Sequence, residues 1–294
     1  IQGFPIRSGK DIQQLQSLCR YVYVDKQKSA PGVMERYQAK RKPEIVATEV
    51  YEKKRGIRKT VAAITKVFSS KRQRETARKV ERSFQASEHI FDETRTLARR
   101  IINDVRVGNS IDTRQAKEVI TDCVDHILKN PDALMMFSNI KHKDSYTSEH
   151  SVNVAILSIM LGRRMRLPRR QLEEVGLAGL LHDVGKILTP DDILNKPSRL
   201  TDEEFLIMKL HPSQGRDMLE ETEGLNKSIL NVAHSHHERL NGSGYPRGLA
   251  QSDLGLYSRI VGITDTYDAI TSDRVYGKGR SNLEATAVPL SRRK

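Results

Sequence analysis

The chain has 294 residues, which suits one large or two ordinary domains, and its 37% hydrophobic content is sufficient for a buried core. Lys and Arg outnumber Asp and Glu by 50 to 37, and the formal charge of +13 favours anionic partners such as nucleic acid, a phosphorylated small molecule or an acidic protein surface. No apolar run reaches the roughly 20 residues that cross a bilayer, and no secretory signal opens the chain, so we expect a globular cytoplasmic protein without membrane contact. The two cysteines, Cys19 and Cys123, are expected to be reduced thiols.

The first region, residues 1–28, combines a helical pattern over Asp11–Cys19 with a short strand of β-branched and aromatic residues, Tyr21–Val24. We expect a small α/β piece whose first strands are missing from the sequence, because one strand and one helix bury too little surface to be stable alone. The residues that follow, up to about Glu49, are polar and basic and contain two prolines, which indicates a flexible connector.

The second region, residues 29–137, adds to this connector a series of apolar side chains at three- and four-residue spacing, which is typical of amphipathic helices. The signals that should end or start these helices are Gly108-Asn109 as a break, Asp112 or Thr113 as a cap, and Asn130-Pro131 as a stop. The helices are expected to pack against the domain that follows, and they could also supply the surface of a homodimer.

Much of the positive charge lies in one stretch of this second region, between Lys53 and Arg82. A solvated helix face, a surface for a protein partner and a nucleic-acid contact are all compatible with it. Few aromatic side chains are interleaved for stacking on bases, so nucleic acid is the least favoured of the three.

The third region, residues 138–294, contains only helical patterns among its long apolar stretches and no strand alternation. The predicted helices cover Val152–Met165, Leu172–Leu181, Glu203–Leu210, Ile229–His236 and Leu256–Ile270. We therefore expect a mainly α protein whose third region is an all-α domain with polar ligands supplied by facing helices.

Seven residues of metal-ligating types are scattered along this third region. They are His150, the pair His182-Asp183, His211, the pair His236-His237, and Asp265. Imidazole nitrogen and carboxylate oxygen suit iron, manganese or zinc, and a divalent cation offsets the cost of burying a carboxylate such as Asp183 behind an apolar helix. The set therefore predicts a pair of divalent metals that activate water for hydrolysis. A single histidine is more often structural, and we keep that interpretation for the remaining four, His89, His126, His142 and His234.

The ligands stand in an ordered series of motifs. The series is His150, LHDVGK at Leu181–Lys186, His211-Pro212, HHERLNGSGYPRGL at His236–Leu249, and DTYDAITSDR at Asp265–Arg274. This order resembles the HD-GYP family of metal-dependent phosphodiesterases, a branch of the HD superfamily, over about residues 142–280. The resemblance implies an all-α HD-GYP domain with two divalent metal ions, either iron or manganese with zinc as an alternative, which hydrolyses cyclic di-GMP to pGpG and GMP in bacterial signalling. The opening residues also resemble part of a small domain that precedes some HD-GYP domains.

The family pattern assigns a role to each matching residue. It makes His150, His182, Asp183 and Asp265 ligands of one metal and His211, His236 and His237 ligands of the second, with Asp183 as the bridge. Lys186 would contact a phosphate or donate a proton to the leaving oxygen, so that Asp183 and Lys186 are the two catalytic residues. The remaining residues would line the substrate or partner surface, and they are Gly244, Tyr245, Pro246 and Arg274.

The chain differs from the family pattern at two positions, and it also differs in where it begins and ends. Trinuclear members carry a glutamate one turn before the first ligand, where this chain has Tyr146, and the neighbouring Glu149 should point elsewhere, so we expect a dinuclear centre. Asn241 replaces the usual aspartate of the loop. The chain stops soon after Arg280, where the family continues into further helices, so we expect a sequence truncated at both ends.

Two alternatives to this enzyme stay open. A non-catalytic module could sense cyclic di-GMP or dock a diguanylate cyclase or other signalling protein through the loop at Gly244, although a pure binder needs no set of seven ligands. An HD phosphohydrolase could act on another nucleotide, although simpler HD enzymes work without the trio His211, His236 and His237.

Overall fold

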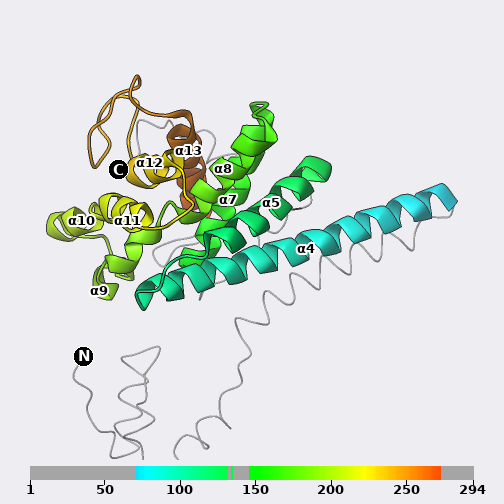
Figure 1. Cartoon of the computed structure of the whole chain (residues 1–294), viewed down its shortest axis with the longest axis horizontal. Helices are drawn as coiled ribbons and strands as arrows, with labels where there is room; N and C mark the ends of the chain where they lie inside the picture. Colours follow the sequence, from blue (N-terminus) through cyan, green and yellow to red (C-terminus); the bar gives the residue numbers. More distant parts are fainter. Residues whose placement is uncertain (1–70, 132–133, 135–145, 273–294) are drawn as a thin grey trace, which may run out of the picture. The chain divides into compact units, whose positions relative to one another are not determined.

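The computed structural model describes residues 71–131, 134 and 146–272, and these belong to the second of two units, Val50–Lys294 (Figure 1). The predicted mainly α fold is confirmed, because the described residues form helices, with an isolated bridge between Asn241 and Ala250 as their β-type pairing. Several predictions lie outside the described residues, namely the α/β piece at 1–28, the connector, the basic stretch before residue 71, and the roles of Cys19, His142 and Arg274. Of the described helices, none is both long and apolar enough to cross a membrane.

The chain enters the described part through a 36-residue helix, α4 (Lys71–Arg106), followed by α5 (Thr113–Lys129). The turn between them contains Gly108 at φ +82°, a left-handed conformation that glycine adopts without strain. Asp112 caps α5, because its carboxylate accepts a hydrogen bond of 3.0 Å from the amide of Gln115. The predicted break, cap and stop are therefore confirmed, since α5 also ends directly before Asn130.

The centre of the domain is the antiparallel pair α7 (Tyr146–Arg164) and α8 (Arg169–Leu181), which lies behind α5 and α4 in Figure 1. The two helices approach closely because α8 carries glycine at the contact. A Cβ on Gly179 would lie 3.0 Å from the Cα of Ala155, so a larger residue would force the helices apart. Around this pair lies a core of buried side chains that includes Ile120, Ile127, Ile156, Ile159, Leu172, Leu181, Leu219 and Ile260.

The remaining elements wrap one end of this pair and carry most of the polar motifs. They are the 3₁₀ helix η1 (Val184–Leu188), α9 (Asp191–Leu194), α10 (Asp202–Met208), α11 (His211–Glu220), α12 (Lys227–Ser235) and α13 (Leu256–Thr271). The end of α8, η1, α11, α12 and α13 lie next to one another there, although these segments are far apart in the sequence.

The predicted helices of the third region all occur, and the structure shows where three of the site residues lie relative to them. His150 lies one turn inside α7, which begins at Tyr146, whereas the sequence predicts a helix from Val152, after this residue. His182 and Asp183 follow the last residue of α8 and do not lie within it, because the chain tightens into the 3₁₀ turn at Val184.

Candidate metal centre

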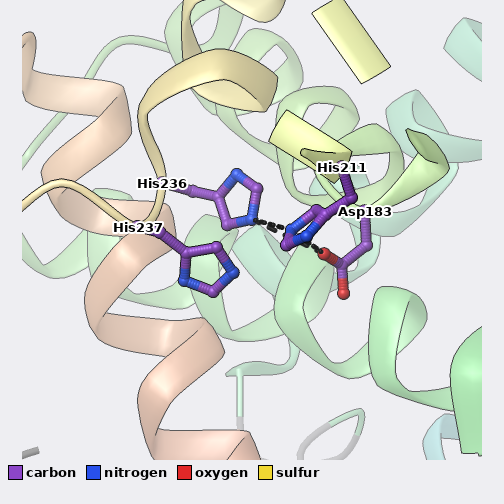
Figure 2. A group of neighbouring side chains, drawn as sticks. All are labelled: Asp183, His211, His236 and His237. Atoms are coloured by element: carbon purple, nitrogen blue, oxygen red, sulfur yellow. Dashed lines mark hydrogen bonds and ion pairs between the residues drawn. The ribbon is translucent and has the colours of Figure 1, made fainter. Parts of the chain in front are cut away.

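The structure brings the seven predicted ligands together into two adjoining groups. One group holds Asp183, His211, His236 and His237, which Figure 2 shows converging from separate elements. The other group holds His150, His182 and Asp265, and within each group the ligand atoms lie within 4.8 Å of one another. Residues from α7, α11, α13 and the ends of α8 and α12 therefore share one buried space.

Asp183 stands between the two groups. Its Oδ2 lies 3.3 Å from Nε2 of His182 and 3.5 Å from Nε2 of His150. Its Oδ1 lies 3.3 Å from Nε2 of His211 and 3.5 Å from Nε2 of His236. Each oxygen of one carboxylate thus faces a different pair of imidazoles, which is the arrangement that a bridge between two cations requires.

A backbone contact at Gly185 brings Asp183 and His211 together. A Cβ at Gly185 would collide with the carbonyl oxygen of His211 and would lie 2.5 Å from the amide nitrogen of Gly215. Only glycine leaves room for η1 to lie against the first turn of α11. His211 and Pro212 open that helix, with the proline in its first turn, where its fixed backbone angle suits a helix start.

Three of the histidines are oriented by the same kind of hydrogen bond to the backbone. In each, Nδ1 donates to the carbonyl oxygen three residues earlier, which leaves Nε2 directed at Asp183. The pairs are His182 with Gly179 at 2.7 Å, His211 with Met208 at 2.7 Å, and His236 with Ala233 at 2.9 Å. Because a carbonyl oxygen only accepts, Nδ1 carries the proton and the lone pair of Nε2 points into the cluster.

His150 is oriented by a carboxylate that the sequence analysis missed. Its Nδ1 lies 2.8 Å from Oδ2 of Asp268, and Oδ1 of Asp268 accepts a 3.0 Å hydrogen bond from the side-chain amide (Nδ2) of Asn153. Asp268 also accepts from the hydroxyl of Ser272 at 3.1 Å. The available signal was spacing, because Asp268 lies three residues after Asp265 and therefore on the same face of α13.

The pKa shifts follow from burial and mutual charge. Burial acts to raise the pKa of Asp183, but His182 and Lys186 outweigh it and hold that pKa well below its usual range. Burial lowers the pKa of His237 well below the usual value, and the adjacent His236 lowers it further. These shifts keep the carboxylate ionised and the imidazole neutral, the states in which both groups bind metals.

His150 shows the opposite shift. Burial acts to lower its pKa, but hydrogen bonds to Asp183, Asp265 and Asp268 outweigh it and raise that pKa well above the usual value. Three carboxylates around one imidazole favour positive charge at this position, which a divalent cation supplies as well as a proton does.

The donor set fits divalent metal ions. Nε2 of His182 and Oδ1 of Asp183 are buried, and within the described part of the chain neither makes a well-directed hydrogen bond. Nε2 of His182 lies 3.3 Å from Oδ2 of Asp183, and Oδ1 of Asp183 lies 3.3 Å from Nε2 of His211. Lone pairs that face each other in this way are costly to bury without a cation between them. The cluster therefore has the residues, burial and unsatisfied atoms of a metal site.

Lys186 and the loop after α12 border the cluster. Nζ of Lys186 lies 2.5 Å from Oδ2 of Asp183, and the lysine side chain keeps 23% of its surface exposed. Tyr245 stacks on His237 with ring centroids 4.7 Å apart and an interplanar angle of 26°. Gly244 lies so close to the backbone of Glu238 that a Cβ would not fit.

Buried Glu238 fixes the shape of this loop, and the sequence analysis gave it no role. Its two carboxylate oxygens accept hydrogen bonds from the amides of Arg247 at 2.7 Å and Leu249 at 2.9 Å. Pro246 lies on the exposed side, next to Tyr245. In the same loop the side-chain oxygen of Asn241 accepts from the amide of Ser243 at 3.1 Å.

Other polar residues lie away from the cluster. Glu149 is 3.8 Å from Arg95 of α4 and belongs to neither ligand group. The described histidines outside the set of seven have other neighbours, since His126 is 2.5 Å from the hydroxyl of Ser87, His89 is 3.1 Å from Glu93, and His234 is 3.4 Å from Ser213.

The family model of the HD domain matches residues 134–293, which is more than half of the chain. The chain belongs to the HD domain family. A second family model, for a domain of unknown function (DUF3391), matches residues 1–116 of this HD-domain protein.

Several curated proteins are similar to this HD-domain protein. A cyclic di-GMP phosphodiesterase of Pseudomonas aeruginosa is 44% identical over 185 residues, which are 63% of this chain and 45% of the relative. A cyclic di-GMP phosphodiesterase of Thermotoga maritima is 38% identical over 58% of this chain and 46% of its own length. A 3′3′-cGAMP-specific phosphodiesterase of Vibrio cholerae is 38% identical over 49% of this chain and 33% of its own length. The chain thus spans less than half the length of these relatives.

A solved structure gives the same fold. The HDG"Y"P protein Bd1817 from Bdellovibrio bacteriovorus superimposes with a TM-score of 0.58 over 81% of this chain and 73% of that protein, at 21% identity. Together with the family match and the curated relatives, it confirms the HD-GYP assignment that the motifs predicted.

Proposed function

We propose that this HD-GYP protein is a phosphodiesterase that hydrolyses cyclic di-GMP to pGpG and GMP with two divalent metal ions, iron or manganese. The observation that carries the proposal is the position of Asp183, whose two oxygens each face a separate pair of imidazole nitrogens. The names of the relatives from Pseudomonas and Thermotoga support the same substrate.

The ligands divide between the two metals as the family pattern implies. His150, His182 and Asp265 would hold one ion, His211, His236 and His237 the other, and Asp183 would contact both. When bound, two divalent cations lower the pKa of a water toward neutrality and offset charge on the phosphoryl oxygens. The Nδ1 hydrogen bonds to backbone carbonyls and to Asp268 hold the imidazoles in position, so little reorganisation is needed at the reacting phosphate.

Lys186 supplies a positive charge at the edge of the cluster. Its ammonium group is oriented by Asp183, and its partial exposure lets a substrate oxygen approach. From this place it can contact a phosphoryl oxygen or donate a proton to the leaving oxygen. Gly244, Tyr245 and Pro246 would border the bound nucleotide, and Arg274 is proposed for the second phosphate from the sequence alone.

A second substrate is favoured by a specific observation. Two of the curated relatives, both from Vibrio cholerae, are named as 3′3′-cGAMP-specific phosphodiesterases. The two cyclic dinucleotides share the diester chemistry and differ in one base, so the metal cluster does not discriminate between them. Selection between them would be made by the residues that contact the bases.

The proposal extends to the organisation of the chain. Residues 138–294 would form the catalytic domain, and residues 1–28 and 29–137 the piece of a small N-terminal domain and the helical connection. A second-messenger substrate would place the activity in the cytoplasm, and a homodimer or a diguanylate cyclase would be the protein partner.

The test is turnover by metal-loaded protein. Protein purified anaerobically and loaded with iron or manganese is incubated with cyclic di-GMP, 3′3′-cGAMP and a linear dinucleotide, and products are separated by chromatography. The proposal predicts loss of cyclic di-GMP with formation of pGpG and then GMP, and about two metal ions per chain by elemental analysis. Binding of cyclic di-GMP without any product would favour the non-catalytic module, and turnover of other nucleotides alone would favour a different phosphohydrolase.

A further inference from the structure

A row of aromatic rings leads from the ligand cluster to the protein surface. The ring of His211 lies 5.0 Å from that of His237, and His237 stacks on Tyr245 at 4.7 Å. The ring of Phe205, on α10, lies 6.1 Å from Tyr245 in an edge-to-face arrangement. The row therefore begins at a predicted metal ligand and ends on a different helix.

The phenyl ring of Phe205 is exposed, although phenyl rings are usually buried in folded proteins. It keeps 41% of its surface accessible, and α10 has no buried residue at all. The helix is nevertheless held in place, because Thr201 and Glu204 form a capping box and Lys196 contacts the Glu204 carboxylate at 2.7 Å. An exposed ring on a fixed helix beside the cluster is suited to ligand contact.

A lysine places positive charge on the same row of rings. Nζ of Lys209 lies 4.7 Å from the ring centroid of Phe205 and 5.6 Å from that of Tyr245. Within the described part of the chain, no carboxylate forms an ion pair with Lys209, so its charge is not already neutralised there. Aromatic faces with an adjacent cation are the chemistry that binds a nucleobase and its phosphate.

We propose that Phe205 and Lys209 form a nucleobase ledge, together with Tyr245, that holds one half of a cyclic dinucleotide while its scissile phosphate lies at the metal cluster. The inference rests on the proposed function and extends it to two residues outside the motifs. The base would stack on the exposed aromatic surface, and the ammonium of Lys209 would contact the phosphate that is not being cleaved. The ledge contributes to affinity and to the choice of nucleotide, whereas the chemical step stays with the cluster.

The test compares Phe205→Ala and Lys209→Met with Leu206→Ala. Leu206 is the neighbouring residue on α10, is 62% exposed, and makes a matched control for the loss of surface on this helix. For metal-loaded protein, kcat and KM are measured with cyclic di-GMP, and the inhibition constant is measured for inorganic phosphate, which has no base. Phe205→Tyr serves as the variant that restores an aromatic face.

The ledge predicts a selective loss of affinity. In Phe205→Ala the KM for cyclic di-GMP should rise about tenfold or more, the range expected for loss of one stacked base. Its kcat, phosphate inhibition and metal content should stay within about twofold of the wild type. Lys209→Met should also raise KM, and both Phe205→Tyr and Leu206→Ala should behave like the wild type.

Three results would overturn the inference. If the wild type is active and Phe205→Ala keeps its KM, or if phosphate inhibition weakens in parallel with KM, the ledge is refuted and the proposed function stands. If the wild type cleaves no cyclic dinucleotide, the proposed function fails and the ledge fails with it.

Discussion

Oδ2 of Asp268 lies 2.8 Å from Nδ1 of His150, and the other ring nitrogen of this histidine, Nε2, faces Asp183 and Asp265. The histidine is therefore held between a carboxylate that orients it and the carboxylates that share its proposed metal. Asp268 is itself fixed by Asn153 of the same helix as His150. The pair connects α7 to α13 at the site, so packing of these two helices and metal affinity should be coupled.

Substitution of Asp268 by Ala should weaken metal binding without removing a ligand. Loss of the carboxylate frees the imidazole of His150 to rotate and lowers its basicity, and such outer residues typically change metal affinity about 10- to 100-fold. Competition with a chromophoric chelator measures the affinity, and a thermal melt of the metal-free proteins checks folding. Unchanged affinity in a folded variant would show that Asp268 does not position His150.

Substitution of Asp183 by Ala should abolish hydrolysis and remove metal from both positions. The reason is that each oxygen of this carboxylate faces a separate group of imidazoles. Activity and elemental analysis are measured on the same preparation, with Asp265→Ala as the comparison that should affect one position more than the other. Full turnover by metal-free Asp183→Ala protein would refute the metal-dependent mechanism.

Substitution of Lys186 by Met should lower kcat while the metal content stays constant. The side chain contacts Asp183 from the partly exposed edge of the site, and removal of a proton donor typically costs about 100-fold in rate or more. The experiment pairs steady-state kinetics with metal analysis, and Lys186→Arg retains the charge for comparison. A loss of metal from Lys186→Met would assign the lysine to ligand support instead.

Substitution of Gly185 by Ala should destabilise the domain and separate η1 from α11. Its Cβ would meet the backbone of His211 and Gly215, neither of which can rotate away, and overpacking of this kind typically costs about 1–3 kcal/mol. Gly255 is the matched control, because nothing lies within 4 Å of its Cβ position and its φ of −61° suits alanine. Urea unfolding of metal-free protein should show a lower midpoint for Gly185→Ala than for Gly255→Ala.

Removal of metal should lower the thermal stability of the described domain. Ions that bind only the folded state stabilise it by mass action, by about 2.7 kcal/mol at a free concentration 100 times the Kd. Melting curves should therefore show higher melting temperatures for the iron-loaded and manganese-loaded protein than for the protein after chelation. If the melting temperature is the same with and without the chelator, the cluster holds no ion under those conditions.

Local sequence signals predicted the helices of this protein because they depend on neighbours along the chain. The apolar spacing and the signals at Gly108, Asp112 and Asn130 act over a few residues. The sequence alone was therefore enough to predict the helices and their ends. The types and the order of the seven proposed ligands could also be recognised in the sequence, because so many imidazoles and carboxylates in one series of motifs indicate a metal site.

Only the tertiary structure decided how those ligands relate to each other. Asp183 faces two separate imidazole pairs because Gly185 lets η1 lie against α11, and Asp268 reaches His150 because α13 packs on α7 across 118 residues. Phe205 joins Tyr245 through a contact between α10 and a loop that follows another helix. Such contacts depend on backbone approach and helix packing between distant segments. Spacing can place Asp268 on the same face as Asp265, but it does not identify His150 as the partner.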